Sequence, residues 1–189
     1  MNYNKKIKVS VVIPTLGGKC LIKTINSLLK SSISPFEILI CIPEENKVTK
    51  LLKSQPIIKI IETKKRGQVF QRSVGFLKAK CDYVLQLDDD EILDVDCIKN
   101  LLETFYNQNT SLISVAPLIL DYNTKLSVYP IPKYNFLNFL LYFVLNGSKG
   151  YASGALTLAG TGIGVNPKLF SSQKTVNVEW LPGGCILHK

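Results

Sequence analysis

Four short apolar runs, each followed by a segment with helical spacing, constrain the fold of this chain more than any other feature. The runs lie at residues 8–13, 36–42, 57–61 and 83–87. Apolar residues that recur every three or four positions mark the helical segments: Leu21, Ile22, Ile25, Leu28 and Leu29; Val48, Leu51 and Leu52; Phe70, Val74 and Leu77; and Val95, Ile98, Leu102 and Phe105 after a capping Asp94. Because repeated strand–helix units make right-handed crossovers, the pattern predicts an α/β fold with a mainly parallel central sheet flanked by helices.

The second part of the chain does not continue this pattern. Residues 112–120 predict one more buried strand, in which Pro117 marks an irregularity or a sheet edge. From about residue 121 onward, Gly, Ser, Pro and Asn are frequent and the strand–helix rhythm stops. With 189 residues the chain is long enough for one domain with a proper core. We therefore expect a single domain with a regular half, residues 1–120, and a loop-rich half, residues 121–189.

Composition excludes several classes of protein. The five cysteines have no C-x-x-C spacing, which indicates reduced thiols in the cytoplasm rather than a zinc site. His188 is the only histidine, so a hydrolase with a Ser–His–Asp or Cys–His system is not indicated. The polar start lacks the apolar core of a secretory signal. The net charge of +9 predicts an anionic partner. Nucleic acid is not expected, because the basic residues are dispersed and no nucleic-acid-binding motif is present.

Three consecutive carboxylates, Asp88, Asp89 and Asp90, follow the fourth apolar run. On an extended backbone Asp88 and Asp90 share a face, whereas Asp89 points the opposite way. Like charges this close repel each other, and Mg²⁺ or Mn²⁺ relieves the repulsion while keeping positions for water and phosphate oxygens. The cluster therefore indicates a divalent metal that carries a diphosphate. A solvated acidic turn that caps the next helix explains the same residues.

The loops after three predicted strands converge at one edge of the sheet. In an open parallel sheet, ligands bind beyond the carboxyl ends of the strands. Pro14 and Thr15, Pro43 and Glu44, and residues 88–90 all occupy that position. We therefore expect these three sequence-distant loops to form one binding site.

Four short motifs follow one another along the chain. They are Val11-Val12-Ile13-Pro14-Thr15; Arg66-Gly67-Gln68 followed by Gln71-Arg72-Ser73-Val74-Gly75; the stretch from Asp82 to Asp90; and Val178-Glu179-Trp180-Leu181-Pro182-Gly183-Gly184. Each motif alone occurs by chance in many proteins, but four in this order and at this spacing resemble family 2 glycosyltransferases with the GT-A fold. The resemblance runs through most of the chain and implies a Rossmann-like domain that binds a nucleotide-diphosphate sugar.

The resemblance also implies a reaction. A sugar would move from the nucleotide-diphosphate donor to a saccharide or lipid-linked acceptor, with metal dependence and inversion by a single displacement. Asp90 would hold Mn²⁺ or Mg²⁺ on the donor diphosphate. Asp88 would contact the ribose or sugar and share in metal binding, while Asp89 supports the turn or shares a ligand role. Metal and arginine together would stabilise the charge that builds on the departing nucleoside diphosphate.

Five further residues are implied on the donor side. Pro14 and Thr15 would hold the base and ribose. Where the family often has an Asp after the second strand, this chain has Glu44, which either reads the base or is a charge favoured in the first turn of a helix. Arg66 matches a basic position near the nucleotide and could grip phosphate or a base edge. Arg72 either faces the same site or covers its helix as a surface arginine.

Trp180, Gly183 and Gly184 match the acceptor-side segment of the family. Glycine lets the backbone approach a sugar, and an aromatic ring offers an apolar face. A core tryptophan beside a tight turn explains the same residues equally well.

The general base of inverting members, an Asp or Glu, is not visible in this chain. Residues 186–189 resemble the opening of a helix, so we expect the chain to be a fragment of a longer protein with the base beyond Lys189. Among the carboxylates present, Asp121 and Glu179 are candidate bases, but neither matches the general-base motif of the family. Two alternatives therefore stay open: an inactive donor-binding or partner-binding protein, and a nucleotidyltransferase, although residues 16–20 lack the glycine and hydroxyl pattern of a phosphate-binding loop.

An apolar, aromatic-rich stretch of 12 residues runs from Tyr134 to Leu145 and is too short to cross a bilayer. Such a stretch could lie on the cytoplasmic face of a membrane beside a lipid-linked acceptor. A core helix or a contact surface for another part of the protein is the commoner explanation. The sequence does not predict an oligomeric state.

Overall fold

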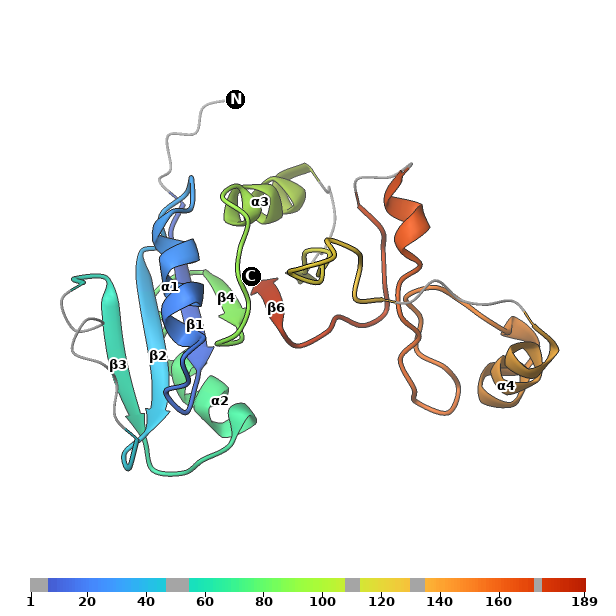
Figure 1. Ribbon diagram of the computed structural model, residues 1–189, viewed down its shortest axis with the longest axis horizontal. Helices are drawn as coiled ribbons and strands as arrows, with labels where there is room; N and C mark the ends of the chain where they lie inside the picture. The colour runs from blue at the N-terminus through green and yellow to red at the C-terminus, as the bar shows by residue number, and fades with distance from the viewer. Residues whose placement is uncertain (1–6, 47–54, 108–112, 130–134, 172–174) are drawn as a thin grey trace. The chain divides into compact units, whose positions relative to one another are not determined.

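The chain divides into two compact units in the computed structural model, which describes residues 7–46, 55–107, 113–129, 135–171 and 175–189 (Figure 1). The first unit comprises Met1–Pro117 and Pro182–Lys189, and the second comprises Leu118–Leu181. The elements of the first unit are β1 (Val9–Pro14), α1 (Leu21–Leu29), β2 (Glu37–Pro43), β3 (Ile58–Thr63), α2 (Gln68–Lys78), β4 (Tyr83–Leu87), α3 (Cys97–Asn107), β5 (Ser114–Val115) and β6 (Cys185–His188). The second unit contains α4 (Phe136–Asn146) and two 3₁₀ helices, η2 (Gly147–Lys149) and η3 (Pro167–Ser171).

One six-stranded sheet organises the first unit, with the strand order β3-β2-β1-β4-β6-β5. β1 pairs in parallel with β2 and β4, and β2 pairs in parallel with β3. β6 is antiparallel to both β4 and β5. The predicted α/β class with a mainly parallel sheet is therefore confirmed. The carboxyl ends of β1, β2, β3 and β4 lie at one edge of the sheet, as parallel pairing requires.

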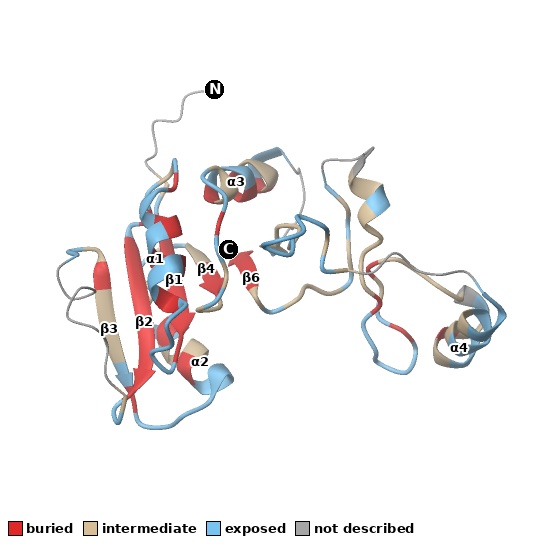
Figure 2. Cartoon of the chain, in the orientation of Figure 1, coloured by how far each residue is buried: buried red, intermediate tan, exposed pale blue. Residues whose placement is uncertain are grey.

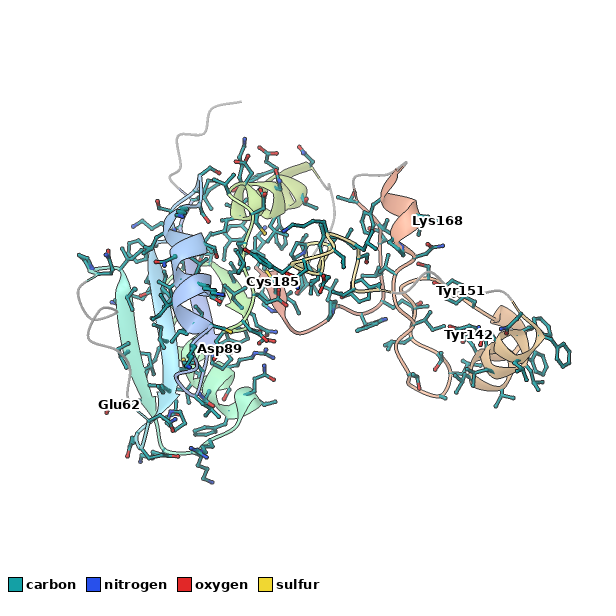
Figure 3. All side chains as sticks on the ribbon, in the orientation of Figure 1. Glu62, Asp89, Tyr142, Tyr151, Lys168 and Cys185 are labelled. Atoms are coloured by element: carbon teal, nitrogen blue, oxygen red, sulfur yellow. The ribbon has the colours of Figure 1, made fainter. Side chains whose placement is uncertain are left out.

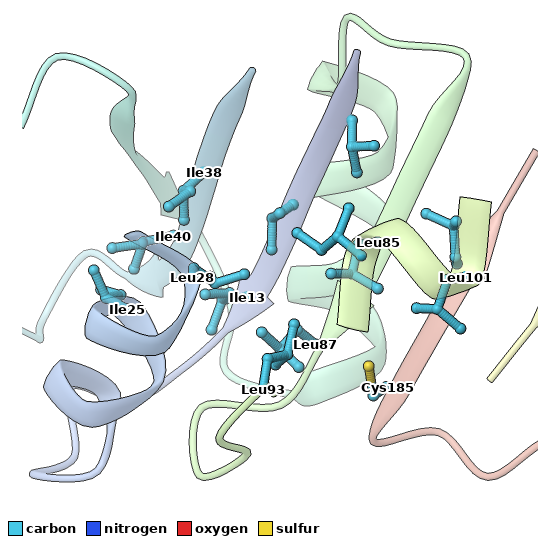
Figure 4. Packing of buried hydrophobic residues seen from close by; sticks show 14 of the residues in the cluster. Ile13, Ile25, Leu28, Ile38, Ile40, Leu85, Leu87, Leu93, Leu101 and Cys185 are labelled. Atoms are coloured by element: carbon cyan, nitrogen blue, oxygen red, sulfur yellow. The ribbon is translucent and has the colours of Figure 1, made fainter. Parts of the chain in front are cut away.

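The sheet buries side chains on both faces because its strands alternate. In β1, Val11 and Ile13 belong to the main core, which α1 and α3 complete, whereas Val12 belongs to a smaller cluster on the opposite face. Figure 4 shows part of the main core, including Ile13 of β1 and Leu28 of α1. β1 and β2 are buried at every residue, as expected for central strands covered on both sides. Figure 2 shows these strands in the colour of buried residues.

The predicted inner face of α2 is wrong. Phe70 and Leu77 are exposed, and the buried residues of this helix are Gln71 and Gly75. A Cβ atom on Gly75 would lie 2.3 Å from Cγ1 of Val12, so the helix approaches the sheet through its smallest residue. Apolar spacing misled the sequence prediction here because a close helix–sheet contact uses small side chains.

Several predicted boundaries also need correction. α3 begins at Cys97 rather than at the predicted cap, and Val95 is exposed instead of packing inward. The predicted strand at 112–120 shortens to β5, a two-residue edge strand, since Pro117 cannot donate to a sheet ladder. The helix predicted around residues 48–52 lies outside the described residues.

The last residues form a strand, not the opening of a helix. β6 pairs with β4 from Val84↔His188 to Leu87↔Cys185 and is buried at three of its four positions. Its apolar run is too short for periodicity to separate helix from strand, and the neighbouring β4 decides the outcome.

The second unit carries an apolar helix with regular caps. Asn135 Oδ1 accepts the backbone N–H of Asn138 at 2.8 Å, and Gly147 ends the helix with a φ of 59°. Within the described residues, no helix combines the length and apolarity needed to cross a bilayer.

The division of the chain at residue 120 into a regular half and a loop-rich half stays a prediction.

Candidate functional site

Thr15 and Asp89 meet at the carboxyl edge of the sheet. Thr15 follows β1, is buried, and donates its backbone N–H to the carbonyl of Cys41 at 3.0 Å. Its hydroxyl donates to the Asp89 carboxylate, and the hydroxyl oxygen accepts the N–H of Gly17 at 2.9 Å. The Asp89 carbonyl accepts from the Thr24 hydroxyl of α1 at 2.9 Å. Two residues predicted for the donor site are thus joined at the ends of β1 and β4, where Figure 3 labels Asp89.

Asp88, unlike the neighbouring Asp89, contacts helix α2. Its Oδ1 accepts from Arg72, with which it forms an ion pair, and from Gln68 Nε2 at 2.8 Å. Arg72 also donates to the carbonyl of Gly183 at 3.0 Å, and the Asp88 N–H donates to the carbonyl of Gly184 at 2.8 Å. The Arg72 side chain is only 15% exposed, so it faces the acidic cluster rather than solvent.

Asp90 and Glu91 complete a carboxylate cluster with Asp88. Burial raises the pKa of Asp88; Arg72 opposes this rise and the charge of Asp90 adds to it. Burial also raises the pKa of Glu91, and the charges of Asp90 and Asp88 raise it further. A Cβ atom on Gly184 would lie 2.9 Å from Oε1 of Glu91, so glycine makes room for this carboxylate. Glu91 is a member of the cluster that sequence reasoning missed, although it extends the same acidic run.

The cluster fits a divalent cation that arrives with a diphosphate. Within the residues that the structure describes, no three His, Cys, Asp or Glu side chains form a metal-binding set by themselves. Mg²⁺ and Mn²⁺ in diphosphate sites take one or two protein carboxylates and complete their shell with water and phosphate oxygens. Asp90 and Asp88 offer such oxygens; burial is the main cause of the raised pKa of Asp88, and the Asp90 charge, which adds to it, is a repulsion that a cation relieves.

Gln71 is a second residue that sequence reasoning missed. Its side chain is buried in α2, and Nε2 donates to the carbonyls of Thr15 at 2.8 Å and Cys41 at 2.6 Å. Oε1 accepts the backbone N–H of Gly67 at 3.3 Å. The available signal was a polar residue four positions before Gly75, on the face that packs against the sheet.

The loops after β2 and β3 meet through a different set of contacts. Glu44 is exposed, and its backbone N–H donates to the carbonyl of Thr63. Arg66 forms its ion pair with Glu45, at 2.9 Å, and not with Glu44. Arg66 also donates to Asn46 Oδ1 at 3.4 Å.

Asn46 extends this link toward β1, because its Nδ2 donates to the carbonyl of Leu16 at 2.7 Å. The loops after β1, β2 and β3 are therefore joined by side chains that the motifs did not single out.

Trp180 belongs to the second unit, whereas Gly183 and Gly184 belong to the first. A Cβ atom on Gly162 would lie 2.6 Å from the Trp180 ring, and the indole N–H donates to the carbonyl of Ile163 at 3.0 Å. Trp180 thus packs beside a turn as a structural tryptophan does.

The two stand-in bases have structural partners. Asp121 Oδ1 accepts from the backbone of Asn123 and from both the N–H and the hydroxyl of Thr124. These hydrogen bonds lower the pKa of Asp121. Glu179 accepts the N–H of Leu156 at 2.7 Å. Both carboxylates hold loops of the second unit.

A family comparison decides the relationship. The model of the family described as "Glycosyl transferase family 2" matches residues 10–160. The chain belongs to the family 2 glycosyltransferases. None of the curated proteins compared with this family 2 glycosyltransferase chain matches it significantly.

The fold resembles that of the solved structure of TarS. The chain resembles residues 1–349 of S. aureus TarS with a TM-score of 0.52 at 17% identity, covering 67% of this chain and 39% of TarS. It also resembles the mannosyltransferase PcManGT from Pyrobaculum calidifontis, solved with GDP-Man and Mn²⁺, with a TM-score of 0.49 at 15% identity. That match covers 60% of this chain and 36% of PcManGT. The family 2 glycosyltransferase chain therefore spans well under half the length of either structure.

Proposed function

We propose that this chain binds a nucleotide-diphosphate sugar and transfers its sugar to a saccharide or lipid-linked acceptor. The observation that carries the proposal is the carboxylate cluster of Asp88, Asp90 and Glu91, set against Arg72 at the carboxyl edge of the sheet. Ligands of open parallel sheets bind at this edge. Membership of family 2 supports the class of reaction.

A divalent cation, Mn²⁺ or Mg²⁺, would be held by Asp90 with a contribution from Asp88, and when bound it would neutralise the donor diphosphate. Asp89 and Thr15 hold the turn that presents these carboxylates. Pro14 and Thr15, at the end of β1, would hold the base and ribose.

Arg72 is held between Asp88 and the Gly183 carbonyl, so its guanidinium is pre-oriented beside the cluster. It would stabilise the charge that develops on the departing diphosphate. Arg66 lies in the loop after β3 with Glu45 and Asn46, and this loop would contact the nucleotide. The role expected of Glu44 would be shared with Glu45, which is the partner of Arg66.

On the acceptor side, Gly183 and Gly184 bring backbone carbonyls next to Arg72 and Asp88. The general base stays unassigned. A base needs a free carboxylate with a pKa near the working pH, and the turn-bound Asp121, whose pKa is lowered, does not meet this requirement.

The donor site is tested by binding. UDP-glucose, GDP-mannose and dTDP-glucose are titrated by calorimetry with and without Mn²⁺, using wild type, Asp90→Asn and the matched surface control Asp82→Asn, whose residue is exposed. We expect one donor to bind in a Mn²⁺-dependent manner, and Asp90→Asn to weaken that binding by about tenfold or more. Binding that ignores both the metal and Asp90→Asn would show that the donor site is assigned wrongly.

One alternative is a protein that binds the donor without transferring sugar. Product analysis with the bound donor and a panel of acceptor sugars separates the possibilities. Release of nucleoside diphosphate with acceptor supports transfer, tight binding without release supports the binding-only alternative, and release of pyrophosphate from a nucleoside triphosphate and a sugar phosphate supports a nucleotidyltransferase.

A further inference from the structure

Gln71 has a hydrogen-bond partner inside the protein for both ends of its amide. The side chain is 2% exposed, so these groups have no access to water. Nε2 donates to the carbonyls of Thr15 and Cys41, at 2.8 Å and 2.6 Å, and Oε1 accepts the N–H of Gly67 at 3.3 Å. Buried polar groups are tolerated when they are satisfied in this way.

The positions of the three partners make Gln71 a bridge between elements. The Thr15 carbonyl lies just past β1, the Cys41 carbonyl lies near the end of β2, and the Gly67 N–H lies at the start of α2. A main-chain hydrogen bond from the Thr15 N–H to the Cys41 carbonyl also joins the ends of β1 and β2. Breaking the side-chain bonds would therefore free the first turn of α2 from the ends of two strands at once.

The side chains that hydrogen-bond to the Asp88 and Asp89 carboxylates are all connected to Gln71. On one side Thr15 donates its hydroxyl to Asp89. On the other side α2 presents Gln68 and Arg72, which both donate to Asp88. The orientations of the Asp88 and Asp89 side chains thus depend on how Thr15 and α2 sit relative to each other.

We propose that Gln71 is a positioning residue of the donor site: it ties Thr15 to α2 and thereby fixes Asp88 and Asp89 for the metal-bound diphosphate. This role rests on the proposed function. Gln71 touches neither the donor nor the cation and acts through Thr15 and the first turn of α2.

The test uses Gln71→Met, which keeps the length and volume of the side chain but removes its donors, with Gln55→Met at an exposed position as the matched control. For whichever of UDP-glucose, GDP-mannose and dTDP-glucose binds the wild type, the Mn²⁺ concentration for half-maximal binding is measured well below the unfolding temperature. We expect about a tenfold increase for Gln71→Met and no change for Gln55→Met. A residue that only stabilises the fold would lower the unfolding temperature and leave the Mn²⁺ requirement unchanged.

Thr15→Val provides a second variant that preserves shape and removes the hydroxyl, which donates to Asp89 and accepts the N–H of Gly17. It should also raise the Mn²⁺ requirement, and it decides the matter if Gln71→Met does not fold. Either variant, folded and with the Mn²⁺ dependence of the wild type, overturns the role of Gln71 while leaving the donor site intact. A wild-type chain that binds none of the three donors with Mn²⁺ overturns the proposed function itself, and the role of Gln71 with it.

Discussion

Glu37 is buried at the amino end of β2, away from the acidic cluster, and its carboxylate has three partners. Oε1 accepts from the Ser10 hydroxyl and from the backbone N–H of Lys80, both at 2.8 Å, and Oε2 pairs with Lys59 Nζ at 2.6 Å. Burial alone would raise the pKa of Glu37, but these hydrogen bonds and the Lys59 charge lower it below its ordinary value of 4.5. Asp88 has a raised pKa, so this chain neutralises a structural carboxylate and leaves the cluster only partly compensated.

Replacing Glu37 by Gln should lower the free energy of unfolding by about 1–3 kcal/mol near neutral pH, because the buried network loses its negative charge and one of its two acceptor oxygens. The folded pKa is lower than the unfolded one, so the stabilisation is complete above about pH 4.5 and is lost as the pH falls through the folded pKa. Urea unfolding of wild type and Glu37→Gln at about pH 7 and about pH 3 measures this. The difference between the two proteins should shrink at the lower pH, and an equal difference at both would contradict the assignment.

The candidate site was only partly predictable from its residues. The run Asp88, Asp89, Asp90 is visible as charge density, and the strand ends are visible as breaks in an apolar pattern. Gln71 and Asn46 carry no such local signal, because their importance comes from backbone carbonyls that are distant in the sequence. Contacts of this kind become apparent only when the strands are placed side by side.

At the scale of elements, α2 depends on one small residue. A Cβ atom on Gly75 would lie 2.3 Å from Cγ1 of Val12 and 2.8 Å from Sγ of Cys41, both of which belong to buried strands. The helix can therefore approach the sheet only if position 75 has no side chain. Since α2 also presents Arg72 and Gln68, this distance matters for the site as well as for packing.

Gly75→Ala should destabilise the protein by about 1–3 kcal/mol, since overpacking outweighs the gain of about 1 kcal/mol that alanine brings to a helix interior. Thermal and urea unfolding measure the change. Ser73→Ala on the exposed side of α2 is the control and should be neutral or slightly stabilising. A Gly75→Ala protein as stable as wild type would mean that α2 lies farther from β1 than the structure places it.

Elements with strong local patterns were predictable and those set by distant partners were not. β1, α1, β2, β3 and β4 start and end within two residues of the expected limits. The prediction for β6 was wrong because its four-residue apolar run takes its structure from the neighbouring β4. The prediction for the inner face of α2 was wrong because Gly75 and Gln71 are not apolar residues with helical spacing.

At the scale of the whole molecule, α4 exposes an unusual amount of apolar surface within the second unit. Its exposed apolar residues are Phe136, Leu137, Phe139, Leu140, Leu141, Phe143 and Val144. Tyr142 instead packs edge-on against Tyr151, with ring centroids 5.1 Å apart; Figure 3 labels both residues. Helices that are apolar on most sides are normally covered by protein or lipid.

Contact of α4 with a membrane surface stays a prediction, and vesicle sedimentation tests it. If α4 lies on the membrane, Phe139→Ser combined with Phe143→Ser should reduce binding to anionic vesicles several-fold, because two aromatic anchors are lost. Leu158→Ser, at a residue that is 75% exposed outside α4, is the control and should bind as wild type does. Vesicle binding that is unchanged by the double substitution would end the membrane hypothesis and favour coverage by protein.

The antiparallel pairing of β6 with β4 has a consequence for biosynthesis. β4 leaves the ribosome about 100 residues before its neighbour β6 is made, and the whole second unit is translated in between. During that interval one side of β4 offers unpaired backbone groups to any passing strand, which is the situation in which nascent chains aggregate or recruit chaperones. Long-range pairing of this kind also slows folding. The pairing of β4 is therefore complete only after β6 has been synthesised.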